Sequence, residues 1–104
     1  MAYTTLSKVR NLFGFSENDA SDEAIAEFIA YVEDEVDSIT GTTWSEGDTY
    51  YAKVQEAAAI LVGSLVYKRF RDKLQLSREL WDEGTQKLEA VSDIPFVASE
   101  EPLE

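Results

Sequence analysis

The stretch AAAILVGSLVY at residues 57–67 decides the fold of this chain, because it carries no charge over about three helical turns. It leads directly into the basic sequence KRFRDK at residues 68–73. A helix that is apolar around its whole circumference needs packing partners on several sides. The other helical segments are short and polar, so the sequence predicts that sister copies of the chain cover part of residues 57–67.

Length and composition indicate one small domain. The chain has 104 residues, 44% of them hydrophobic, and a formal net charge of −12. This apolar content is too high for a disordered protein, and the length suits a single modest core. We expect a helical domain over residues 1–91 and an extended C-terminal tail over residues 92–104.

Helical spacing of apolar residues predicts an all-α fold, a small bundle of about four helices with that extended C-terminal tail. The expected helices span approximately residues 5–13, 22–40, 49–73 and 78–91. The predicted N-terminal caps are Thr5, Ser21, Asp48 or Thr49, and Ser77. Gly14 and Gly41 are expected to end the first two helices in the left-handed conformation. Two prolines, Pro95 and Pro102, favour extended backbone after Ser92.

The residue types present exclude most enzymatic chemistry. The chain has no cysteine and no histidine, which removes thiolate nucleophiles, imidazole catalysis and zinc sites of the usual kind. No glycine-rich phosphate loop is present. We therefore expect no enzyme activity and no cofactor. A carboxylate-only metal site stays as a remote alternative, because Glu33, Asp34, Glu35 and Asp37 point in different directions on a helix and favour a solvated face.

The N-terminal sequence has no apolar leader, which favours a protein that stays in the cytoplasm. The uncharged stretch is also shorter than the roughly 20 residues that span a bilayer, so no membrane association is expected.

The charges are segregated along the chain. No lysine or arginine occurs between Arg10 and Lys53, a region rich in aspartate and glutamate. Basic residues gather instead at residues 68–78. They can complement the dipole of the third helix, or meet the acidic helix of a neighbouring copy in a head-to-tail contact. The predicted subunit interface comprises Ile60, Val62, Val66, Tyr67, Lys68, Arg69, Arg71 and Lys73, with Glu33, Asp34 and Asp37 as acidic partners.

Three segments resemble the small head-tail connector, or adaptor, proteins of tailed phages and related archaeal viruses. They are YTTLSKVRNLFG at residues 3–14, ITGTTW at 39–44 and LVYKRF at 65–70. The resemblance covers roughly residues 3 to 90. It implies a virion protein of the neck that forms a homo-oligomeric ring, commonly of twelve copies, beneath the portal protein. Such a ring joins the capsid to tail, stopper or neck proteins and lets DNA pass without specific binding.

In the connector family the C-terminal segment often contacts the portal. Carried over to this sequence, the resemblance implies that Trp81, Leu88, Ile94, Phe96 and Val97 dock on the portal. The acidic excess departs from ordinary phage members and suits a virus of a salty habitat, since halophilic proteins carry many carboxylates. The alternative function is a small acidic regulatory protein that mimics DNA and occupies the basic groove of a nucleic-acid enzyme.

Overall fold

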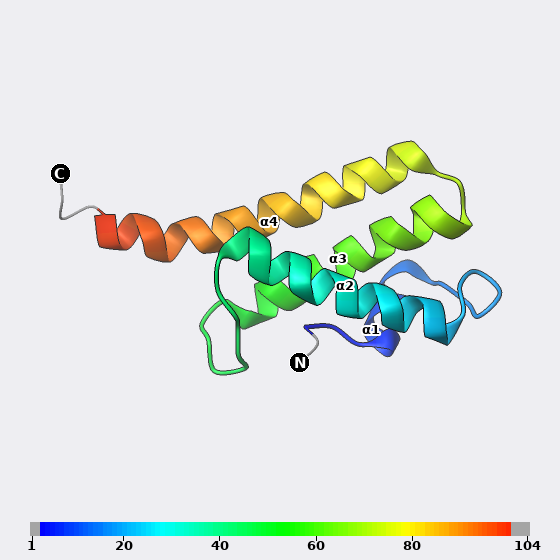
Figure 1. The fold of residues 1–104 in the computed structure, drawn as a ribbon, viewed down its shortest axis with the longest axis horizontal. Helices are drawn as coiled ribbons and strands as arrows, with labels where there is room; N and C mark the ends of the chain where they lie inside the picture. Colours follow the sequence, from blue (N-terminus) through cyan, green and yellow to red (C-terminus); the bar gives the residue numbers. More distant parts are fainter. Residues whose placement is uncertain (1–2, 101–104) are drawn as a thin grey trace.

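The computed structural model describes residues 3–91 with their side chains and residues 92–100 as backbone alone. Within this part of the chain there are four helices and no strand, which confirms the all-α prediction. The helices are α1 (Leu6–Phe13), α2 (Asp22–Thr40), α3 (Tyr51–Phe70) and α4 (Leu74–Glu100). Figure 1 shows α3 and α4 as an antiparallel pair, with α1 on the side of α3 away from α4 and α2 crossing α3 to contact α4 as well.

The ends of α1 and α2 form as the sequence predicts. The side-chain oxygens of Thr5 and Ser21 accept hydrogen bonds from the backbone N–H groups three residues later, at 3.2 Å in both cases. Gly14 and Gly41 follow the two helices with φ values of 73° and 75°. Glycine adopts this left-handed backbone without the steric cost of a Cβ atom, so these helix ends are encoded locally.

The predicted caps of α3 and α4 are wrong. The Asp48 carboxylate accepts the backbone N–H of Ser45 at 2.8 Å and so closes a turn of the preceding loop. The first helical residue is Tyr51, and its helix has no side-chain cap. Ser77 lies inside α4, which begins earlier, at Leu74.

A tight reversal at Asp72 explains why α4 starts early. Asp72 has a φ of 52°, and the Lys73 backbone N–H donates to the Tyr67 carbonyl at 3.1 Å. Aspartate tolerates the left-handed region better than most residues. The chain therefore reverses within residues 71–73, and these residues alone form the loop between α3 and α4.

The α4 backbone continues to Glu100, beyond the predicted helix end near Val91. Pro95 lacks a backbone N–H and its ring crowds the carbonyl four residues earlier, a combination that kinks or ends a helix, so the helical backbone beyond Pro95 is not explained by local sequence. The side chains of the predicted anchors Ile94, Phe96 and Val97 lie outside the described residues, as do residues 101–104.

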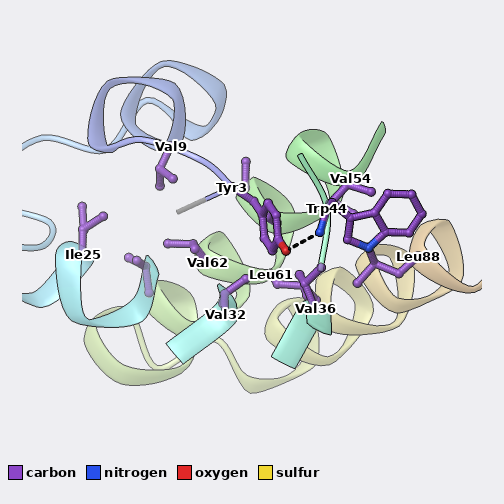
Figure 2. Close-up of a cluster of buried hydrophobic side chains, with 14 of the residues drawn as sticks. Tyr3, Val9, Ile25, Val32, Val36, Trp44, Val54, Leu61, Val62 and Leu88 are labelled. Carbon is purple, nitrogen blue, oxygen red and sulfur yellow. Dashed lines mark hydrogen bonds between the residues drawn. The ribbon is translucent and has the colours of Figure 1, made fainter. Parts of the chain in front are cut away.

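The uncharged stretch forms the centre of the protomer. Every residue from Ala57 to Ser64 is buried, and Leu61 and Val62 are fully so. Val9 of α1, Ile25 and Val36 of α2 surround them in the same core (Figure 2). The expectation that sister copies must cover this helix is therefore wrong for residues 57–64, because one protomer encloses them.

Small residues make this enclosure possible. Gly63 of α3 faces the Phe13 ring so closely that a Cβ atom there would lie 2.1 Å from ring atom Cε2. On the opposite side, a Cβ atom at Gly84 of α4 would lie 2.6 Å from Leu61 Cδ2. Without these side chains, two helices approach α3 closely from different directions, and a chain of this size can bury an apolar helix.

Tyr3 ties the N-terminal segment to the loop after α2. Its ring is buried, and its hydroxyl donates to the Asp37 carboxylate and accepts the Trp44 backbone N–H at 2.9 Å. Figure 2 shows the second of these bonds as a dashed line. Burial, followed by the hydrogen bond to Asp37, raises the pKa of Tyr3 to about 12. The Tyr3 hydroxyl thus remains protonated at pH values at which an exposed tyrosine ionises.

Tyr3→Phe is expected to lower the free energy of unfolding by about 2 kcal/mol at pH 7, because the buried Trp44 N–H loses its acceptor. The folded protein keeps the Tyr3 proton up to about pH 12, whereas the unfolded chain loses it near pH 10. This contribution is therefore present below pH 10 and declines as the pH rises toward 12. Urea unfolding of the unmodified protein and of Tyr3→Phe from pH 7 to 11 measures this contribution. A difference in unfolding free energy between the two proteins that widens with pH would contradict this account.

Candidate functional site

A surface groove of about 500 Å³ opens between α2, α3 and α4, beside the α3–α4 turn. Its volume lies in the range of sites that hold ligands or side chains of a partner. The groove combines apolar, basic and hydroxyl side chains. It is lined by Tyr31, Ser64, Leu65, Lys68, Leu74, Ser77, Arg78, Trp81 and Asp82.

The floor of the groove is a reciprocal serine pair between α3 and α4. The Ser64 hydroxyl donates to the Ser77 carbonyl at 2.7 Å, and the Ser77 hydroxyl donates to the Ser64 carbonyl at 2.8 Å. Both residues are buried. The pair holds the two helices together at close range, and since both hydroxyl protons are engaged, the floor is structural and offers no free nucleophile.

The walls of the groove present large apolar side chains to solvent. Tyr31 and Leu74 are each 51% exposed, and Trp81 and Leu65 are half-buried. Scattered apolar residues are normal on a protein surface, but several that line one hollow are typical of a docking surface. Trp and Tyr in particular supply large contact area at interfaces.

Two cations stand at the rim. Lys68 and Arg78 are exposed and line the groove from α3 and α4. Within residues 3–91 neither forms an ion pair, and the only acidic side chain lining this groove is Asp82. The excess positive charge favours an occupant that carries carboxylates.

Arg71, another member of the predicted cluster, is used inside the protomer. Its guanidinium lies 2.7 Å from the Asp19 carboxylate in the loop before α2. Hydrogen bonds from Ser16 lower the pKa of Asp19, with a smaller contribution from the Arg71 charge. This contact fixes the loop against the end of α3, so Arg71 is less available to a partner than the sequence suggested.

The apolar half of the predicted interface lies in the core. Ile60, Val62 and Val66 are buried within the protomer, at 6%, 0% and 0% exposure. Tyr67 is half-buried, with its ring edge against Phe13 and Phe15. These positions were expected to contact a sister copy because the remaining helical segments look too short and too polar in sequence to wrap α3. In the structure the other three helices of the same protomer pack on α3.

The charged half of the predicted interface is divided. Lys68, Arg69, Lys73 and Asp34 are exposed. Arg69 also lies over the Phe70 ring, 5.8 Å from its centroid.

The other two acidic candidates are partly enclosed. Asp37 is half-buried and accepts the Tyr3 hydroxyl, and Glu33 is half-buried with interactions inside the protein. They contribute less to a free acidic surface than Asp34 does.

The predicted portal contacts are divided too. Leu88 is fully buried between α3 and α4 and belongs to the core, whereas Trp81 lines the groove. Ile94, Phe96 and Val97 have no described side chains. Of the residues predicted to dock on the portal, Trp81 is thus the one that the described surface presents to a partner.

The sequence pattern did not predict that Tyr31, Leu65 and Leu74 share one site. Tyr31 falls outside the apolar stripe of α2, and Leu74 follows the basic cluster, so neither belongs to a predicted core face. Large apolar residues off the core stripe are a usable signal. It identifies individual surface positions, but only the antiparallel α3–α4 pair brings them together.

Among the described residues, no three aspartate or glutamate side chains lie close enough together to hold a metal ion. Over the same residues, no helix combines the length and the hydropathy that crossing a bilayer requires. Comparisons with protein-family models, with curated proteins and with solved structures give no match to this chain. The resemblance to head-tail connectors therefore depends on the sequence segments quoted above.

Proposed function

We propose that this protein is a ring-forming head-tail adaptor, a structural virion protein that docks beneath a portal and joins the capsid to the tail or neck. The observation that carries the proposal is that one small subunit presents two surfaces of opposite charge. One is the groove with its basic rim and aromatic wall; the other is the carboxylate face of α2. A subunit with complementary patches in different places associates head to tail, and such contacts close into rings when the rotation permits.

The carboxylate face of α2 is defined by Glu23, Glu27 and Asp34, which are all exposed. They recur at helical spacing along one side of the helix. Between Arg10 and Lys53 the chain has no basic residue that would neutralise them. Any part of this face that stays uncovered in a ring and borders its lumen would repel phosphates and let DNA pass without adhering.

The test is assembly on a portal. The full chain is mixed with the portal protein encoded in the same genome and imaged by electron microscopy. We expect a ring of this protein on one end of the portal. Lys68→Glu combined with Arg69→Glu is expected to reduce ring occupancy at least tenfold, because both side chains are exposed and unpaired with carboxylates in residues 3–91.

Lys53→Glu is the matched control, an exposed basic residue on α3 that lies outside the groove. It is expected to leave ring occupancy unchanged. Chains that stay monomeric in the presence of the portal would contradict the adaptor proposal.

The exposed carboxylates of α2 also suit the second candidate, a DNA mimic that blocks a nucleic-acid enzyme. That function would require the carboxylate face and would not involve the groove. Glu23→Lys with Glu27→Lys would then abolish inhibition of the target enzyme, while Lys68→Glu would have no effect. The adaptor proposal expects no such inhibition from the unmodified chain.

A further inference from the structure

We propose that the groove beside the α3–α4 turn binds the C-terminal segment, residues 92–104, of a second copy of this chain. The inference deepens the proposed function, since it names the contact between neighbouring subunits. It depends on three observations: the chemistry of the groove, the sequence of the segment, and the direction in which α4 runs.

The chemistry of the two parts is complementary. The segment reads SDIPFVASEEPLE, with apolar residues between carboxylates and no lysine or arginine. The groove offers the aromatic and aliphatic walls of Tyr31, Leu74 and Trp81, with Lys68 and Arg78 at the rim. Apolar side chains such as Phe96 supply burial in such a groove, while opposite charges fix orientation.

The segment cannot reach the groove of its own protomer. The groove residues of α4 lie in its first turns, up to Asp82, and the helix then runs away to Glu100 at the opposite end of the molecule (Figure 1). At about 1.5 Å per residue, the α4 backbone at Ile94 lies about 24 Å along the helix from Arg78. The occupant must therefore come from another copy.

The contact is head to tail, because the two subunits contribute different surfaces to it. One protomer contributes the α3–α4 turn end and the next contributes the far end of α4, so an open chain of subunits keeps one unoccupied groove and one unoccupied segment until a ring closes. The elongated shape, 53 × 28 × 19 Å, places these two surfaces far apart on the subunit.

The face of α2 is a weaker candidate for the same groove. Its exposed residues Glu23, Glu27 and Asp34 supply carboxylates but few apolar side chains. The half-exposed walls at Leu74 and Tyr31 would then remain in contact with water. The C-terminal segment supplies both kinds of group in one short stretch.

A labelled peptide of residues 92–104, titrated with the full-length chain and followed by fluorescence anisotropy, tests the proposal. We expect saturable binding that a peptide of the same composition in scrambled order does not reproduce. Arg78→Glu in the full chain is expected to weaken binding at least tenfold, since it reverses an exposed rim charge. Lys53→Glu, a reversal of an exposed charge outside the groove, is expected to leave binding unchanged.

Trp81→Ala is expected to weaken peptide binding at least tenfold as well, and circular dichroism checks that the variant remains folded. Absence of saturable binding at about 1 mM protein, which corresponds to about −4 kcal/mol, would overturn the proposal. Equal loss of binding in Arg78→Glu and Lys53→Glu would also overturn it, because the groove would not be the site.

The outcome is separable from that of the portal experiment. Peptide binding without rings on a portal would support this contact and contradict the adaptor role. Rings on a portal without peptide binding would support the adaptor role and show that another surface joins the subunits.

Discussion

Leu61→Ala is expected to lower the free energy of unfolding by about 3–5 kcal/mol, the largest effect of any single substitution considered. Leu61 is fully buried at the centre of α3 and packs against α4 at Gly84. Shortening it removes the transfer free energy of the lost isopropyl group and leaves a cavity that surrounding helices only partly fill. A domain of this size is stabilised by about 5–15 kcal/mol in total, so the variant retains little margin.

Urea denaturation followed by far-UV circular dichroism measures this loss. Leu12→Ala is the matched control, because Leu12 is 54% exposed and its truncation is expected to change stability by no more than about 0.5 kcal/mol. A loss below about 1 kcal/mol for Leu61→Ala would show that α3 and α4 do not pack as the structure describes.

Gly84→Val is expected to destabilise the protein by about 3 kcal/mol for the opposite reason. An added Cβ atom would lie 2.6 Å from Leu61 Cδ2 and 3.3 Å from the Ala57 carbonyl oxygen. Neither group can move aside, since Leu61 is enclosed and the carbonyl belongs to the α3 backbone. Overpacking of this kind costs about 1–3 kcal/mol, and the branched side chain adds further crowding.

Gly47→Val is the control, because an added Cβ atom at Gly47 meets nothing within 4 Å. Thermal unfolding gives the melting temperatures of Gly84→Val, at a contact between helices, and of Gly47→Val, at an open loop position. Equal melting temperatures for both glycine variants would contradict the close approach of α4 to α3.

The double variant Leu61→Ala with Gly84→Val tests the contact directly. The valine methyl groups can occupy space that the shortened Leu61 side chain vacates, so the combined loss is expected to be at least about 1 kcal/mol smaller than the sum of the single losses. Strict additivity would show that the two residues do not touch.

Local chemistry made part of the fold predictable. Thr5 and Ser21 cap their helices with their own side chains, and Gly14 and Gly41 end them through backbone freedom. These interactions involve residues three or four apart, so they can be recognised without knowledge of distant contacts. The acidic face of α2 was predictable for the same reason, because charge and helical period are both written in the order of residues.

Prediction failed where a residue's role depends on a distant partner. Ser77 has the chemistry of a cap, yet its hydroxyl donates to the Ser64 carbonyl across the helix pair. Asp37 was assigned to an acidic interface, yet its carboxylate accepts a hydrogen bond from the Tyr3 hydroxyl. In both cases a polar side chain could satisfy its hydrogen bonds in several ways, and packing selected one.

The sequence by itself determined an all-α chain, the caps of the first two helices and the separation of acidic from basic segments, because each depends on neighbouring residues. The tertiary structure decided that Ile60, Val62 and Val66 face inward and that Tyr31, Leu74 and Trp81 share one groove. An apolar residue is equally suited to a core or an interface. Which of the two it joins depends on whether another helix of the same chain can come close enough, and here Gly63 and Gly84 allow that approach.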